Sequence, residues 1–211
     1  FRVPERAELG ERLDAVLEAI YATFAEGWSD PAGTETRRRN LAAEGIWLGR
    51  LMASLIPEEP ETLGLLALML FAEARRTARR GHDGDFVPLD EQDTALWDEA
   101  LIEEAEGLLR RAAAMGIIGR YQLEAAVQSA HTARRRGGAT DWTAIRQLYD
   151  ALMAIAASPV VAINRAARAE LSARLGMATE ATEAYDQAIG LERDPALRRF
   201  LLDKRARVAR A

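Results

Sequence analysis

The sequence contains no cysteine and only two histidines among its 211 residues. Without cysteine there can be no disulfide and no thiolate metal ligand, which fits a reducing cytoplasm. His82 and His131 stand in neither a His-Glu-x-x-His nor a Glu-x-x-His arrangement, so no zinc or carboxylate-type metal site is expected. Phosphate-binding glycine loops and nucleophile-elbow motifs are also missing. The sequence therefore predicts no enzyme, no catalytic residue, no bound metal and no cofactor.

Apolar runs long enough for a membrane are missing as well. In "TLGLLALMLFAEARRTARRG", Leu63–Ala72 is free of polar side chains for only ten residues, whereas a bilayer span needs about 20. We therefore expect a buried helix over 61–80, covered by neighbours on every side, and no contact with a membrane. The arginines that follow are expected to mark where this helix emerges into water. They are Arg75, Arg76, Arg79 and Arg80.

The start of the chain has no secretion signal. "FRVPERAELGERLD" carries charges where a signal peptide needs an apolar region, and it lacks an initiator methionine. We expect a cytoplasmic protein and a piece of a longer polypeptide.

Alternating strand patterns are nearly absent, whereas Ala, Leu, Glu and Arg dominate the composition. The sequence predicts an all-α fold of about nine helices, stacked as antiparallel, tetratricopeptide-like hairpins. We expect an N-terminal bundle over 1–135, packed around the 61–80 helix, and helical hairpins over 139–211. The two regions are expected to form one continuous structural unit.

The last third of the chain carries a repeat-like pattern. In "ARAELSARLGMATEATEAYDQAIGLERDP", small residues and one aromatic occur at the spacing of a tetratricopeptide repeat. These residues are Gly176, Ala181, Tyr185 and Ala188. "ATDWTAIRQLYDALMAIAASP" repeats the second half of that pattern. Small residues let two helices approach closely and the aromatic fills the remaining gap, so stacked hairpins are predicted.

Charge gives a candidate interaction face. The net charge is −5, which argues against nucleic-acid binding. Direct DNA contact through the arginine clusters is therefore the least favoured hypothesis. An acidic segment begins at residue 90, and basic partners would be steered toward it. The candidate face is Asp90, Glu91, Asp93, Asp98 and Glu99. A merely solvated face explains these residues equally well.

Four aromatic residues give an alternative hypothesis, a small-molecule-sensing domain with a pocket between hairpins. The candidate lining residues are Trp97, Tyr121, Trp142 and Tyr149. Aromatics at helical spacing are more often core than ligand site, so a polar cavity is what would favour this alternative.

Several stretches, taken together and in order, resemble one known family. They are "FAEGWS", "AAEGIWLGRLMASLIPEEPETLGLLALMLFAEARR", "LDEQDTALWDEALIEEAEGLL", "YQLEAAVQSAH" and "TDWTAIRQLYDALMAIAASPVVAINRA". They are similar to the long C-terminal extension of one group of bacterial extracytoplasmic-function RNA polymerase sigma factors. "PEEPETLGLLALML", "LDEQD" with Trp97, and "SPVVAINRA" are the most specific parts of the resemblance.

The resemblance implies a regulatory or protein-interaction module that acts in transcription initiation. Its implied partners are its own sigma domains or the RNA polymerase core, with promoter DNA contacted only by domains absent from this chain. One departure stands out, because the family continues after "PVVAINRA" through another hairpin, whereas here the next helix follows directly at Ala166-Ala167. We expect either a deleted hairpin or an omitted segment at that junction.

Overall fold

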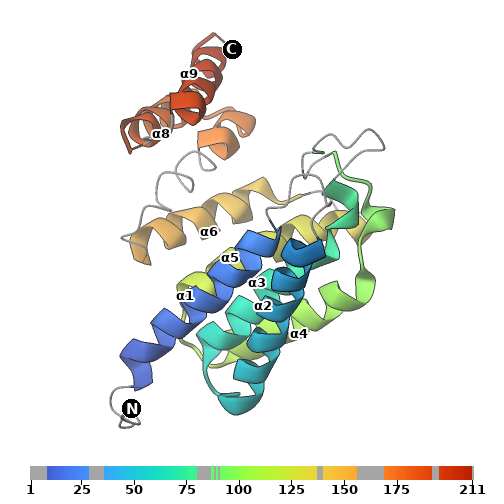
Figure 1. Cartoon of the computed structure of the whole chain (residues 1–211). Helices are drawn as coiled ribbons and strands as arrows, with labels where there is room; N and C mark the ends of the chain where they lie inside the picture. The colour runs from blue at the N-terminus through green and yellow to red at the C-terminus, as the bar shows by residue number, and fades with distance from the viewer. Residues whose placement is uncertain are drawn as a thin grey trace. The chain divides into compact units, whose positions relative to one another are not determined.

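The computed structural model describes residues 9–28, 36–79, 87, 89, 91–136, 140–155, 169–191 and 195–210, and every regular element within them is a helix (Figure 1). The helices are α1 (Leu9–Trp28), α2 (Thr36–Leu55), α3 (Pro60–Ala74), α4 (Glu99–Ala114), α5 (Arg120–Thr132), α6 (Trp142–Ile155), α8 (Ala178–Leu191) and α9 (Pro195–Val208). Residues 169–174 form a further helical segment, and the short 3-10 helices are η2 (Thr77–Arg79), η3 (Thr94–Leu96) and η4 (Ala133–Arg136). The expected all-α fold of about nine helices, packed as sequential pairs, is confirmed.

The chain divides into two compact units, residues 1–128 and 129–211. Helix α5 begins in the first unit and its last residues belong to the second. "SPVVAINRA" and the junction at Ala166-Ala167 lie outside the described residues.

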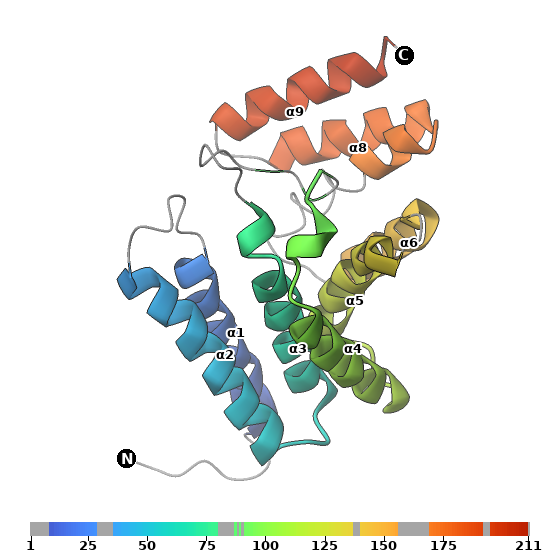
Figure 2. The same cartoon turned by 90° about the vertical axis from the view of Figure 1, so that its right-hand side faces the viewer.

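Helix α3 is the centre of the first unit. All ten residues from Thr62 to Phe71 are buried, so the helix is covered on every side as its composition predicts. The α1–α2 hairpin packs on one side of α3 and α4 packs on the other (Figure 2). A Cβ atom on Gly64 would lie 2.7 Å from the backbone nitrogen of Gln122, so α5 also approaches α3 closely.

Helix α2 packs through small residues. Among the described side chains of α2, the fully buried positions are Ala42, Gly45 and Gly49. A Cβ atom on Gly45 would lie 2.8 Å from the Cβ atom of Phe24 in α1, and one on Gly49 would lie 2.6 Å from the Met69 side chain in α3. Ile46, Leu48 and Met52 are half-buried against the same core, whereas Trp47, Leu51 and Leu55 are exposed.

Helix α3 starts where the sequence predicts but ends earlier. Pro60 opens it, and the Glu59 side chain accepts a hydrogen bond from the Glu61 backbone N–H. It ends at Ala74, not at residue 80, and Arg75 is not where it emerges into water. Arg75 is only 8% exposed, because its Nε donates to the carbonyl of Phe71 at 3.1 Å.

The other arginines of that cluster also differ from the expectation. Arg76 is half-buried and forms an ion pair with Glu73 at 2.7 Å, and Arg79 is half-buried in η2. Arg80 lies outside the described residues. Glu73 and the Phe71 carbonyl near the end of α3 are thus among the partners of this positive charge, as expected near the negative end of a helix dipole.

Helix α5 takes its N-terminal cap from a residue about 60 positions away. Ile118 and Gly119, which precede α5, have no capping side chain. Glu61 of α3 instead accepts hydrogen bonds from the backbone N–H groups of Tyr121 (2.9 Å) and Gln122 (3.1 Å). A Cβ atom on Gly119 would lie 2.1 Å from the Glu61 carboxyl carbon, so only glycine leaves room for this contact.

The second unit contains a hairpin with the predicted repeat positions inside. Ala181, Tyr185 and Ala188 are buried in α8, and Gly176 has a φ of 74° in the turn before it. The Tyr185 hydroxyl donates to Glu170 of segment 169–174 at 2.8 Å. Leu201 of α9 joins the same small apolar core.

The close approach of α1 and α2 predicts a penalty for any side chain at residue 45. Gly45→Ala places a methyl group against the backbone of Phe24, and we expect it to lower the free energy of unfolding by about 1–3 kcal/mol. Gly107→Ala is the matched control, because its nearest contact is Arg110 at 4.0 Å. The control should be stabilising by about 0.5–1 kcal/mol from helix propensity alone. Urea unfolding measures both, and equal effects would contradict the close packing.

The borrowed cap predicts a pH dependence. Burial raises the pKa of the Glu61 carboxyl above its ordinary value of 4.5, against the lowering effect of its hydrogen bonds. The folded chain then holds this proton to higher pH than the unfolded chain, so stability from this group is lost as pH rises from 4.5 through the raised pKa. Urea unfolding between pH 4 and 8 should show wild-type stability declining relative to Glu61→Gln over that window. Parallel curves for the two proteins would refute the assignment.

Candidate interaction surfaces

The acidic segment supplies helix caps as well as surface charge. Asp93 accepts a hydrogen bond from the N–H of Ala95 at 2.9 Å at the start of η3. Asp98 accepts one from the N–H of Leu101 at 3.1 Å and so caps α4. Asp90 lies outside the described residues. The two described aspartates thus have a local structural role, which is the usual reason for Asp at a helix start.

Two other members of the candidate face, Glu91 and Glu99, are exposed residues that do not cap a helix. Glu99 stands in the first turn of α4, where a negative charge is favoured by the helix dipole. The candidate face therefore contains two helix-capping aspartates and two exposed glutamates.

The four candidate pocket aromatics belong to two different units. Trp97 and Tyr121 are buried in the apolar core of the first unit, at 5% and 6% exposure. The ring of Tyr121 meets that of Tyr21 edge-on, with centroids 5.8 Å apart, and burial raises the pKa of Tyr121 to about 12. These two residues have the environment of core side chains.

The other two aromatics, Trp142 and Tyr149, are half-buried on α6 in the second unit. The Trp142 ring lies edge-on to His131, with centroids 5.7 Å apart, and the Arg174 guanidinium stands 4.8 Å from its centre. A cation over an indole is favourable, so Trp142 links three segments of this unit. A pocket shared by all four aromatics remains a prediction.

A pocket of about 450 Å³ does occur within the second unit, at other residues. It is lined by Glu170, Ala173, Gly176, Ala178, Tyr185, Lys204, Arg207 and Val208. Glu170 is its hydrogen-bonding centre, accepting from Tyr185 at 2.8 Å and from Lys204 at 3.1 Å. Burial raises the pKa of Glu170, but these hydrogen bonds outweigh burial and leave that pKa below its ordinary value. The pocket therefore offers a carboxylate at neutral pH beside two basic side chains.

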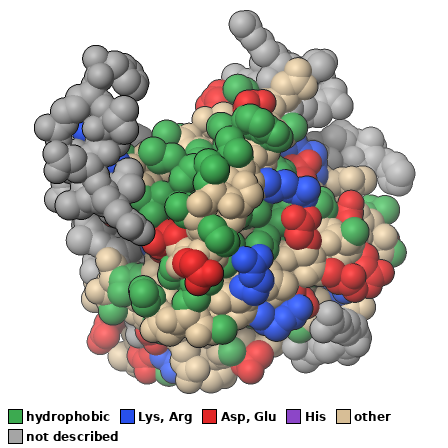
Figure 3. Space-filling view, turned by 90° about the horizontal axis from the view of Figure 1, so that it is seen from below, with side chains coloured by type: hydrophobic (Ala, Val, Ile, Leu, Met, Phe, Trp, Pro, Cys, Tyr) green, Lys and Arg blue, Asp and Glu red, His purple; other side chains and the backbone are tan. Residues whose placement is uncertain are grey.

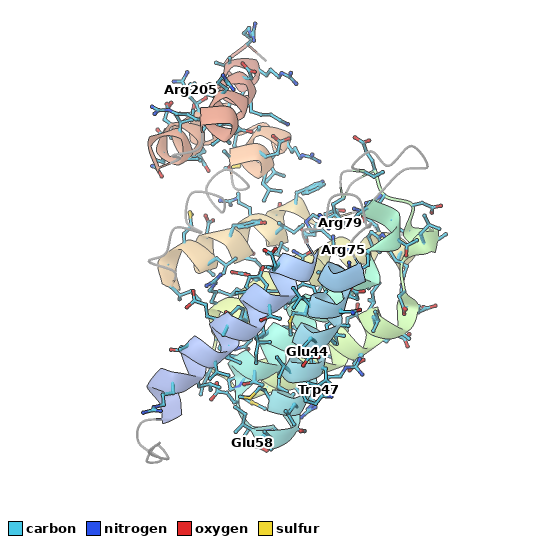
Figure 4. All side chains as sticks on the ribbon, viewed as in Figure 1. Glu44, Trp47, Glu58, Arg75, Arg79 and Arg205 are labelled. Atoms are coloured by element: carbon cyan, nitrogen blue, oxygen red, sulfur yellow. The ribbon has the colours of Figure 1, made fainter. Side chains whose placement is uncertain are left out.

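The end of α3 carries a buried positive charge. Arg75 donates hydrogen bonds to the Phe71 carbonyl and to the side-chain oxygen of Gln128 in α5, at 3.1 and 2.5 Å. Burial, and the nearby charge of Arg79, lower the pKa of Arg75 to about 10. The guanidinium stays charged at neutral pH and joins the ends of two helices. Figure 4 shows both arginines at this end of the unit.

Helix α2 exposes an apolar stripe that sequence analysis did not single out. Its members are Leu41, Trp47, Leu51 and Leu55, exposed by 36%, 57%, 38% and 66%. Figure 3 shows one side of the molecule, on which apolar side chains gather between charged ones. Two features of the sequence could have predicted this stripe. Small residues occur at Ala42, Gly45 and Gly49, and large apolar residues occur at intervals of four at Trp47, Leu51 and Leu55.

Across the described residues, no three His, Cys, Asp or Glu side chains gather where they could hold a metal ion. None of the described helices is both long and apolar enough to cross a bilayer.

Comparison with known proteins gives one family and one relative. The model of a family described as "Family of unknown function (DUF6596)" matches residues 12–113. The chain is 36% identical over 222 residues to an uncharacterized protein of Rhizobium meliloti (strain 1021), covering 90% of this chain and 52% of that protein. The chain thus spans about half the length of this curated relative. No solved structure matches this chain.

The alignment with the relative contains a difference in length. Because 90% of 211 residues is about 190, an aligned stretch of 222 positions leaves about 30 positions of the relative without a counterpart in this chain. A tetratricopeptide hairpin is about 34 residues long, so the difference matches the length of one hairpin.

The family match runs from α1 into the last turn of α4, and so contains the buried α3 and the helices packed on both sides of it. The similarity to the DUF6596 family therefore covers the α3 core of this chain.

Proposed function

We propose that this chain is the regulatory, protein-binding C-terminal part of a bacterial extracytoplasmic-function RNA polymerase sigma factor. It acts in transcription initiation, in the cytoplasm, by binding its own sigma domains or the polymerase core. Promoter DNA is contacted by the upstream sigma domains and not by this chain.

The observation that carries the proposal is the partial match to a longer relative. The aligned 90% of this chain covers only 52% of the relative, so the relative has further length that this chain does not match. Sigma domains upstream of this part would supply the remaining length. The most direct test is the coding region that precedes this sequence, which should encode sigma domains. A different upstream domain would reject the proposal.

The stretches that carry the resemblance also occupy packing positions, which supports the same conclusion. "AAEGIWLGRLMASLIPEEPETLGLLALMLFAEARR" contains Gly45, Gly49, Pro60, Glu61 and Gly64, each at a helix contact, helix start or cap described above. The residues of this stretch are thus tied to the packing of this fold.

Exposed acidic charge predicts a salt-sensitive complex. We expect Glu91→Lys combined with Glu99→Lys to weaken binding to the sigma domains about tenfold, because charge complementarity steers partners and two reversals oppose it. Isothermal calorimetry at low and high salt measures this, and wild-type binding should weaken with salt through screening.

A matched control for this prediction exists in the second unit. Glu180 stands in the first turn of α8 as Glu99 does in α4, and Glu183 is exposed on the same helix. Glu180→Lys with Glu183→Lys changes the net charge equally and should leave binding unchanged. Equal weakening by both pairs would show that only overall charge matters and would reject the acidic face.

A second candidate function is small-molecule sensing, which the pocket around Glu170 favours. A ligand with a cationic or hydrogen-donating group would meet Glu170, and an anionic group would meet Lys204 or Arg207. Native mass spectrometry of the protein purified from cells should then detect a bound small molecule that Lys204→Met loses. An unchanged mass before and after mild denaturation would reject this function.

A further inference from the structure

The most buried and the exposed positions of α2 differ in side-chain size. Its most buried positions are Ala42, Gly45 and Gly49, with Ile46, Leu48 and Met52 half-buried beside them, whereas four other large apolar residues are exposed. Trp47, Leu51 and Leu55 follow one another at intervals of four residues, which places them on one side of the helix. With Leu41, they form the α2 stripe, which extends over 14 residue steps or about 21 Å at ~1.5 Å per residue.

Acidic side chains accompany the stripe. Glu44 lies between Leu41 and Trp47, and Glu58 follows in the turn after α2; both are exposed (Figure 4). Neither has an ion-pair partner among the residues that the structure describes. The nearby Arg50 is engaged with Glu104 of α4 at 2.7 Å, so its charge is already compensated. The stripe is therefore apolar along its length and negative at intervals.

We propose that the α2 stripe binds an amphipathic helix that carries basic residues toward both ends of its apolar face. An apolar helix surface with a central tryptophan suits a helical partner, and aromatic anchors often dominate such interfaces. Glu44 and Glu58 would meet the basic residues of that helix. This inference rests on the proposed protein-binding function and names the surface and the chemistry of the partner.

A second copy of this chain is the competing occupant, and its stripe would bring like charges to the same surface. Two α2 stripes brought face to face would bring four carboxylates together, from Glu44 and Glu58 of each copy. The stripe itself contains no basic residue to compensate them, and like charges at an interface are costly.

The test uses a fluorescein-labelled, designed helical peptide of about 18 residues, enough to cover the stripe at ~1.5 Å per residue. It carries leucines on one face and lysines at both ends; a second peptide has glutamate in place of each lysine. Fluorescence anisotropy with the full 211-residue chain should show tighter binding of the lysine peptide. Trp47→Ala should weaken that binding at least tenfold, and Glu44→Lys with Glu58→Lys should reverse the preference.

Ile118→Ala is the matched control, because Ile118 is 70% exposed but lies in the segment before α5. It should leave binding unchanged, and the thermal midpoints of all variants should stay close to wild type because each altered side chain is exposed. Equal binding of both peptides, or no effect of Trp47→Ala, overturns the inference. A dimer in light scattering that Trp47→Ala dissolves also overturns it, in favour of a second copy.

The same variants separate this inference from the proposed function. If the sigma domains bind the chain and Trp47→Ala leaves their affinity unchanged, the α2 stripe is not the binding surface and the proposed function stands. If the lysine peptide binds at Trp47 while the sigma domains and core polymerase do not bind at all, the surface stands and the proposed function fails.

Discussion

The complete burial of α3 is the constraint on which the first unit depends. A helix that is apolar on all sides has no face to give to water, so helices must enclose it. Enclosure also leaves the polar groups near its ends to be satisfied inside the protein. The structure meets this requirement with charged side chains at each end. Glu61 accepts hydrogen bonds from α5, and Arg75 donates to the last turn of α3 and to Gln128.

These end contacts fix how α4 and α5 are placed on α3. The apolar contacts along α3 are not directional, whereas the hydrogen bonds of Glu61 and Arg75 fix where α5 begins and how it runs past α3. Asp98 adds a third fixed point, since its backbone N–H donates to the carbonyl of Ala74 at 2.9 Å and its side chain caps α4. Burial holds the helices together, and polar contacts at the ends of α3 set their order.

The sequence predicts the features that depend on local patterns. The buried helix follows from an apolar run, its start from Pro60, and the hairpin of the second unit from the spacing of Gly176 and Tyr185. The cap of α5 could not be predicted, because Glu61 is far away in the sequence and only the absence of a capping residue before Arg120 hints at it. Arg75 was assigned to water because arginine is usually exposed, and here its guanidinium finds carbonyl partners.

The surface was harder to predict than the core for a related reason. The sequence alone does not distinguish an acidic residue that caps a helix, as Asp93 and Asp98 do, from one that is exposed to solvent, as Glu91 is. The α2 stripe was missed because glycine and alanine occupy the buried side of that helix, so large apolar residues no longer indicate the core. Small residues at the most buried positions of α2, and large apolar ones among the exposed polar residues, distinguish this helix from an ordinary amphipathic one.

The small residues of α2 have a further consequence for how relatives of this domain can diverge. Since the most buried positions of α2 are Ala42, Gly45 and Gly49, the exposed side chains Trp47, Leu51 and Leu55 can be exchanged without changing those closest contacts. If the α2 stripe binds a partner as proposed, its specificity and the packing of the helix would depend on largely separate positions.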